Sequence, residues 1–264
     1  FYGAGMVLLL LGLFSVAAYL LLFYLRGANQ IAYIIIGALL LKATFSLRGL
    51  RRGALRVKGL LVDGELGAAR IEVRSLVGRD TSGLEKPQVV SAVVESVAEN
   101  TCDSFVAPIF FFLLFGVPGA LAYRVSNTLD AMMGYHGRYE HLGKFAARLD
   151  DFLNWVPARL SGLLLVLAAF MGRGDGRAAW RIMLGHHGRT ESPNAGWTMS
   201  AAAGALGVEL EKVGHYRLGE GGRPLLPETI DSALRLTLTA ASIWVFVSLA
   251  VMGAVMGVRF ALAS

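Results

Sequence analysis

Acidic side chains recur at helical spacing in the stretch 88–104, QVVSAVVESVAENTCDS. If this stretch is a helix, Glu95, Glu99 and Asp103 lie four residues apart and share one face. Asn100 lies beside that face. Carboxylates at this spacing repel one another, so a cation should offset them, either Mg²⁺ or a nearby basic side chain. The other interpretation is a solvated face near a membrane surface, and this stretch alone leaves both open.

Two later stretches mix acids with amides and arginines. In GALAYRVSNTLDAMMGY, Tyr123, Asn127 and Asp130 fall on one helical face. Arg124 is their neighbour in the sequence. The stretch ARLDDFLNWVPARL contains the third group, whose members are again spaced three or four residues apart: Arg148, Asp150, Asp151 and Asn154.

These residue types together suit a phosphorylated, anionic substrate and a metal. Carboxylate and amide oxygens suit Mg²⁺, which often bridges phosphates, and the guanidinium fork binds phosphate or carboxylate. The sequence contains no GxxxxGK[ST], HExxH or GxSxG motif. The spacing of the polar residues therefore leaves an enzyme and a transporter equally open.

The rest of the chain predicts membrane helices that position these groups. Of the 264 residues 55% are hydrophobic and only 17% are charged, compared with roughly 25% charged residues in soluble domains. We predict an all-α, polytopic integral membrane fold in a single domain over residues 1–264, with cytoplasmic helical loops. Candidate spans are residues 1–25, 31–47, 105–122 and 236–262.

The net charge of +6 comes largely from basic residues beside these spans, a pattern typical of cytoplasmic loops rather than of nucleic-acid binding. The densest basic run covers residues 48–58, which we expect in the cytoplasm. Two prolines and two glycines interrupt 105–122, so this segment either crosses once with a kink or returns as two half-helices. We favour the re-entrant pair.

Three further local structures are expected. Residues 55–80 are predicted to form a soluble helix that ends in the turn VGRDTSGL, where Arg79 is a candidate phosphate ligand. Ser192, Pro193 and Asn194 form a turn before a helix of small residues that should pack closely on another helix. GHYRLGEGGRPL, residues 214–225, is predicted to be a loop.

Four stretches, in order, carry a resemblance to a known family: ESVAENTCDSFVAPIF, GALAYRVSNTLDAMMGY, RLDDFLNWVPARL and SPNAGW. They resemble the CbiB/CobD family of cobalamin biosynthesis. The resemblance implies adenosylcobinamide-phosphate synthase activity, an amide ligation of adenosylcobyric acid with aminopropanol or its O-phosphate. It also implies ATP, Mg²⁺ and an integral membrane position. Because ATP and corrinoid intermediates are cytoplasmic, we expect a multi-pass protein of the inner membrane whose site faces the cytoplasm, in contact with lipid and with other membrane enzymes of the pathway.

The family motifs map onto individual positions of this sequence. Residues in the catalytic motifs are Glu95, Glu99, Asn100, Asp103, Asn127, Asp130, Asp150, Asp151 and Asn154. We expect Glu99, Asp103 and Asp151 to bind Mg²⁺. Predicted substrate ligands are Arg79, Arg124, Arg148, Arg159, Ser192 and Asn194. The alternative for Asn154 and Asn194 is helix capping.

Two departures from the family pattern are present. The family usually opens with a GDP-containing stretch that is missing here, so we expect residues upstream of Phe1. Arg189, Thr190 and Glu191 stand where the family commonly has a histidine before SPN. Alternatives to the ligase are an AmpE-like membrane protein, a transporter, and a scaffold for corrinoid enzymes.

Overall fold

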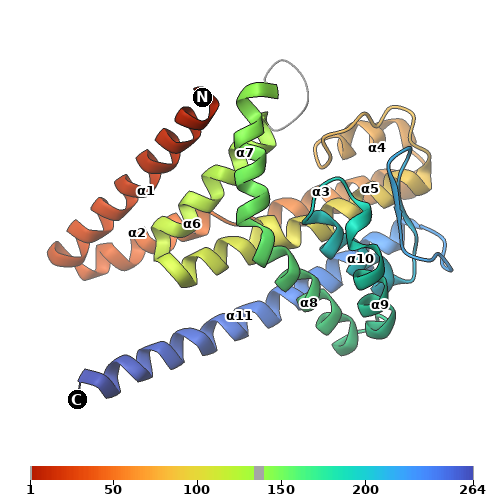
Figure 1. Ribbon diagram of the computed structural model, residues 1–264. Coiled ribbons are helices and arrows are strands. Elements are labelled where there is room, and N and C mark those ends of the chain that lie inside the picture. The colour runs from red at the N-terminus through yellow and green to blue at the C-terminus, as the bar shows by residue number, and fades with distance from the viewer. Residues whose placement is uncertain (1, 134–139, 264) are drawn as a thin grey trace. The chain divides into compact units, whose positions relative to one another are not determined.

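The structure is a computed structural model that describes residues 2–133 and 140–263, and it is almost entirely helical (Figure 1). The all-α prediction is confirmed. The chain forms two compact units, Phe1–Ser46 with Asp103–Pro157 and Leu47–Cys102 with Ala158–Ser264. Each unit is formed by two separate stretches of the chain, so the two units are not consecutive domains.

The first unit is built from long apolar helices. Its elements are α1 (Tyr2–Ala28), α2 (Gln30–Ala43), most of a π-helix (Cys102–Val106), α6 (Ala107–Met133) and α7 (Glu140–Leu153). Asn29 separates α1 from α2, and its side chain accepts a hydrogen bond of 3.0 Å from the amide of Ala32, which caps α2. Helix α1 packs on α6 and α7. Most apolar side chains of α1 and α2 are exposed, as expected for helices that face lipid.

Helix α6 is broken at Gly116 and folds back on itself (Figure 1). The backbone angles of Gly116 are φ 68° and ψ −161°, a region open essentially to glycine alone. The rings of Phe111 and Tyr123 stack with centroids 5.2 Å apart, whereas a continuous helix would separate residues twelve apart by about 18 Å. The predicted broken span is therefore a helical hairpin, as in the re-entrant interpretation.

Replacing Gly116 by alanine should destabilise this hairpin. Alanine cannot adopt the observed φ without strain, and such strain costs about 1–3 kcal/mol. The midpoint of thermal unfolding in detergent should fall. Gly12→Ala in α1 is the control, because a Cβ there meets no atom within 4 Å. Equal midpoints for the two variants would mean that the positive φ is not needed.

The second unit surrounds α5 (Lys86–Thr101), whose middle is almost completely buried. Small and β-branched side chains let neighbouring elements approach α5 closely. The other elements are α3 (Leu47–Val62), α4 (Leu66–Val73), α8 (Trp155–Met171), α9 (Gly176–His186), the 3₁₀-helix η2 (His187–Arg189), α10 (Ala195–Leu206), β1 (Leu210–Lys212), β2 (Tyr216–Leu218) and α11 (Pro227–Ala263). Elements α3, α4, α10, α11 and β1 all pack on α5.

Helix α10 confirms the predicted close packing of small residues. It lies against α9, and a Cβ built on Gly204 would come within 2.6 Å of the carbonyl oxygen of Ala178. Any larger residue at this position would force the two helices apart. Gly207, with φ 67°, then ends α10 in the left-handed conformation.

Two local predictions are wrong. Residues 55–80 do not form one helix: α3 already starts at Leu47, and Gly64, with φ 82°, separates it from α4. The predicted loop 214–225 contains strand β2, which pairs antiparallel with β1 so that Leu210 faces Leu218. Strands of three residues carry too little periodicity to be recognised before their partner is known.

Four described helices are long and apolar enough to cross a membrane, or five if the bent pair 143–153 and 155–171 counts as one more span. One of the four covers residues 86–133. Because it includes the hairpin at Gly116, its whole length does not form one straight crossing of the membrane. The protein thus has the helices of a multi-pass membrane protein.

Candidate functional site

A hydrogen-bonded network in the first unit converges on Asp150. Asn127 donates to one carboxylate oxygen of Asp150 over 3.4 Å, and Asn154 donates to the other over 2.9 Å. Arg124 donates to the Asn127 side chain over 3.2 Å, and the Tyr123 hydroxyl donates to Asn154 over 2.9 Å. Four predicted site residues are thus brought together. Tyr123 joins them, although only its place in the polar stripe indicated it.

The residues of this network come from α6, from α7 and from the residue that follows α7. Tyr123 and Arg124 lie about one turn before Asn127 on the returning arm of α6. Asp150 lies in the last turn of α7, and Asn154 directly follows the end of that helix at Leu153. The side chain of Asn154 bonds to Tyr123 and Asp150, so the contacts shown for Asn154 join three segments.

Asp130 and Asp151 add negative charge to this network. Each is an electrostatic neighbour of Asp150 and of the other. Three neighbouring carboxylates repel one another unless a cation or hydrogen-bond donors offset them or one of them keeps a proton. We name this set, Asp130, Asp150 and Asp151, the acidic cluster.

The carboxylate oxygens of the acidic cluster suit Mg²⁺, which binds hard oxygen ligands. Within the described ranges 2–133 and 140–263, no three His, Cys, Asp or Glu side chains are arranged as a metal-binding group. The absence of such a group among the described residues is compatible with Mg²⁺ binding, because Mg²⁺ is usually held by one or two carboxylates together with waters and substrate phosphates. The predicted ligands Glu99, Asp103 and Asp151 are divided between the two units, and their role stays a prediction.

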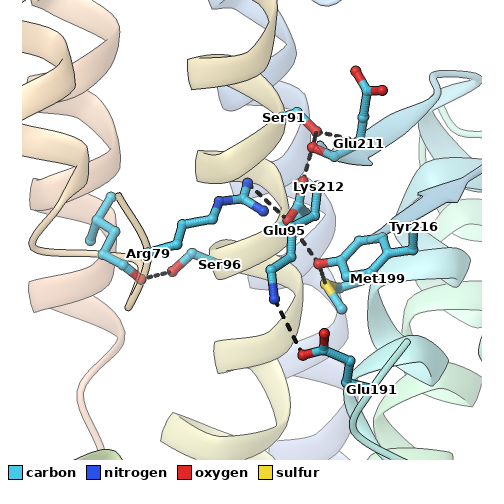
Figure 2. Close-up of polar contacts among 10 residues, drawn as sticks. Arg79, Ser91, Glu95, Ser96, Glu191, Met199, Glu211, Lys212 and Tyr216 are labelled. Carbon is cyan, nitrogen blue, oxygen red and sulfur yellow. Dashed lines mark hydrogen bonds and ion pairs between the residues drawn. The ribbon is translucent and has the colours of Figure 1, made fainter. Parts of the chain in front are cut away.

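A second network, in the second unit, is centred on the buried carboxylate of Glu95 (Figure 2). The Ser91 hydroxyl donates to one of its oxygens over 2.8 Å, and the Tyr216 hydroxyl donates to the other over 2.9 Å. Arg79 forms an ion pair of 3.2 Å with Glu95, and the Glu211 amide donates to Ser91 over 2.8 Å. Glu95 is therefore engaged by the protein itself.

This network ties the β1–β2 hairpin and the loop 74–85 to α5. Ser96 on α5 donates to the carbonyl oxygen of Leu76 over 2.9 Å, which fixes the loop that carries Arg79. Burial, followed by the negative charge of Glu95, raises the pKa of Tyr216 far above its ordinary value, so this phenol stays a proton donor. Sequence reasoning missed Tyr216 as a partner of Glu95, whereas Ser91, four residues before Glu95, lies on the same helical face as expected from its spacing.

The acidic stripe predicted for residues 95–103 does not follow one regular α-helix. Glu95 and Glu99 lie on α5, but Asp103 lies in the π-helix, whose wider turn changes the spacing. Glu99 and Asp103 are partly exposed. Asn100 donates to the carbonyl oxygen of Ser96 over 2.9 Å. Single-turn π-helices are frequent at functional sites, which makes Asp103 notable.

The remaining predicted substrate ligands lie around the start of α10, apart from Arg148, which is exposed on α7. The guanidinium of Arg159 lies 4.9 Å from the ring centre of Trp197. Ser192 accepts hydrogen bonds from the amides of Asn194 and Ala195, over 3.2 and 3.4 Å. Asn194 itself does not cap α10 with its side chain. Ser192, rather than Asn194, therefore performs the capping.

His186 and His187 have separate partners, as expected for adjacent residues. His186 accepts a hydrogen bond of 3.1 Å from the Gly219 amide, and His187 stacks on Trp197. Burial, followed by the charge of Arg189, lowers the pKa of His186. The fold therefore favours the neutral ring, which can accept this hydrogen bond.

We expect the stability that neutral His186 contributes to fall as pH is lowered through the ordinary pKa of histidine, near 6.5. Below that value the unfolded chain binds a proton that folded His186 resists, so protonation favours unfolding. The difference between the unfolding midpoints of the wild type and His186→Gln, measured from about pH 8 to about pH 5, should show this loss. The pKa of Glu191 is also lowered, but it affects stability only below about 4.5. A wild-type slope retained in His186→Gln would contradict the assignment.

Comparisons with known proteins agree on one family. A family model described as CobD/Cbib protein matches residues 1–256. A Dehalococcoides mccartyi protein named "Cobalamin biosynthesis protein CobD" is 57% identical over 250 residues, covering 95% of this chain and 81% of the relative. A Geobacter metallireducens protein of the same name is 44% identical over 235 residues, covering 88% and 73%.

An archaeal relative extends the match. A Methanothermobacter thermautotrophicus protein named "Probable cobalamin biosynthesis protein CobD" is 45% identical over 217 residues, covering 82% of this chain and 73% of the relative. No solved structure matches this chain. The ordered motifs, the helical membrane-type fold and the match over nearly the whole chain lead to one conclusion: the chain belongs to the CobD/CbiB family of cobalamin biosynthesis proteins.

Proposed function

We propose that this protein is an adenosylcobinamide-phosphate synthase. It would join a propionate carboxylate of adenosylcobyric acid to (R)-1-aminopropan-2-ol O-phosphate, or to the free amino alcohol, with consumption of ATP. The observation that supports this most is the network in which Arg124, Asn127 and Asn154 converge on Asp150 beside two further carboxylates. Relatives named for cobalamin biosynthesis support the pathway.

The proposed reaction has two steps. The propionate carboxylate first accepts the γ-phosphoryl group of ATP, giving an acyl phosphate and ADP. The amine then attacks the acyl carbon, phosphate leaves, and the nitrogen loses one proton. That proton must pass to a base within hydrogen-bond reach of the attacking nitrogen, a role that the leaving phosphate can fill. Arg124, directed at Asn127 in the structure, supplies positive charge near the acidic cluster.

Mg²⁺ would supply charge stabilisation for phosphoryl transfer. In this proposal Asp151, one of the predicted ligands, and the neighbouring Asp130 hold it. Asp150 is buried and already accepts two amide hydrogen bonds, so we assign Asp150 to positioning and charge. Glu95 holds Arg79 and Tyr216 in place, and we propose the same kind of positioning role for it.

We place the acidic cluster on the cytoplasmic side of the inner membrane, where ATP is available. The hairpin in α6 supports this, because its second arm returns toward the side from which the first arm entered. A re-entrant hairpin also allows non-helical backbone at Gly116 to be shielded by protein. Contact with other membrane enzymes of the pathway belongs to the same proposal.

A nutritional experiment tests the reaction. A bacterial strain that lacks its own CobD and depends on cobalamin should grow on supplied adenosylcobyric acid only when it expresses this protein. The same strain should grow on adenosylcobinamide without it, which is the control for every later step. Expression of the folded protein with no growth on adenosylcobyric acid would contradict the proposal and favour an AmpE-like or scaffold role.

A further inference from the structure

A cavity in the second unit contains none of the predicted site residues. Its volume is about 640 Å³, within the range usual for small-molecule sites. The end of α8, the end of α10 and the start of α11 surround it. The cavity therefore calls for an explanation separate from the acidic cluster and from the Glu95 network.

Three arginines line the cavity, and each comes from a different segment. Arg173 follows α8, Arg223 precedes α11, and Arg235 lies in the third turn of α11. Within the described part of the chain, none of them forms an ion pair. Glu228 is the one acidic residue in the cavity lining, so the lining carries a net positive charge.

The fold holds the backbone at these arginines in fixed positions. The turn that contains Arg173 is tied to α10, because the Asp175 amide donates to the carbonyl oxygen of Ala205 over 3.0 Å. The amide of Arg223 donates to the carbonyl oxygen of Gly207 over 3.0 Å. On α11, Arg235 donates to the Ser232 hydroxyl over 2.9 Å. The backbone near Arg173 and Arg223 and the side chain of Arg235 are thus held before any ligand arrives, which lowers the cost of binding.

The other residues that line the cavity indicate which chemical groups its ligand contains. The hydroxyl groups of Ser232 and Thr239 also line the cavity, but they donate to the carbonyl oxygens of Glu228 and Arg235. The guanidinium groups are therefore the main donors for a ligand, and they recognise phosphate oxygens well. Apolar residues such as Leu206 and Leu236 complete the wall. No aromatic side chain is among the described residues that line it, so the cavity offers no stacking surface for a nucleotide base.

The position of the cavity also favours a ligand that carries a phosphate group. Helix α8 ends at Met171, and the apolar part of α11 begins after Arg235. Where apolar helices end, the bilayer gives way to its phosphate-bearing interface. We propose that this cavity is a binding site for a phosphate group on an aliphatic body, held by Arg173, Arg223 and Arg235. The phosphate belongs either to an anionic lipid headgroup or to a free phosphate monoester.

Binding to purified protein in detergent tests the proposal without ATP or a corrinoid, so its outcome is independent of the ligase activity. Dioctanoyl phosphatidylglycerol and glycerol 3-phosphate are titrated separately by calorimetry, with dioctanoyl phosphatidylcholine as the lipid that has no net charge. The variant Arg173→Gln/Arg223→Gln/Arg235→Gln should bind the preferred anionic probe at least about tenfold more weakly, as expected for lost charged hydrogen bonds.

The matched control is Arg177→Gln/Arg181→Gln, which removes two arginines of α9 outside the cavity. This control should bind as the wild type does. Binding of phosphatidylglycerol alone identifies a lipid site, and binding of glycerol 3-phosphate identifies a site for a soluble monoester. The three single variants are measured as well, in case the triple variant does not fold. The proposal would be overturned if both lipids bound equally and no cavity variant changed their binding. It would also be overturned if neither anionic probe bound.

Discussion

Replacing Glu95 by alanine should cost about 3–5 kcal/mol of stability, because it leaves Arg79 partly buried without its anionic partner. The side chains of Glu95 and Arg79 are only 6% and 18% exposed, so water can replace the lost ion pair only poorly. The substitution also removes the acceptor of the Ser91 and Tyr216 hydroxyls. Chemical unfolding in detergent should show a large loss, and the β1–β2 hairpin should loosen first in hydrogen exchange.

The control for Glu95 is Glu72→Ala, which breaks an exposed ion pair. Arg56 and Glu72 lie 3.3 Å apart with side chains 64% and 27% exposed, and such pairs contribute about 0–1 kcal/mol. Arg79→Ala combined with Glu95→Ala should cost less than the sum of the two single changes, since the pair is coupled. Additive losses would show that Arg79 and Glu95 do not interact.

Asp150→Asn should lower the rate of amide formation about 10²- to 10³-fold while the protein stays folded, as for loss of a preorganised charge. The change keeps the volume of the side chain, so the packing of α7 should not change. It removes a charge that Asp130 and Asp151 repel and also one of the two acceptors used by Asn127 and Asn154. These effects oppose each other, so the unfolding midpoint should change little. Loss of activity without loss of stability is the signature of charges assembled for function.

Asp63→Asn is the matched control, because Asp63 is exposed just after α3 and belongs to neither network. Product formation by the control and by Asp150→Asn is measured at saturating substrates, with unfolding midpoints on the same preparations. A rate for Asp150→Asn within about twofold of the control would exclude a role for the Asp150 charge.

Much of the fold could be predicted because apolar runs and their interruptions depend on local sequence. The long apolar runs gave α1 and the apolar part of α11, and the glycines and prolines near 116 indicated the break in α6. Helical spacing placed Asn127, Asp150 and Asn154 as candidates. Their convergence needed the break at Gly116 and the packing of α7 on α6, which spacing within one helix does not specify.

Contacts between distant parts of the chain could not be predicted. Tyr216 lies 121 residues after Glu95 in the sequence, and its strand is only three residues long. Arg173, Arg223 and Arg235 look like ordinary basic residues until three helix ends bring them to one cavity. The π-helix at Cys102 likewise depends on packing, and it changes the expected spacing before Asp103.

The central claim is the amide ligation, and one assay addresses it most directly. Purified protein in detergent is supplied with adenosylcobyric acid, aminopropanol phosphate, ATP and Mg²⁺, and mass spectrometry follows the corrinoid. The account predicts adenosylcobinamide phosphate together with an equal amount of ADP, and a much slower reaction with Asp150→Asn. Well-folded protein that forms no amide with either aminopropanol phosphate or free aminopropanol would contradict it.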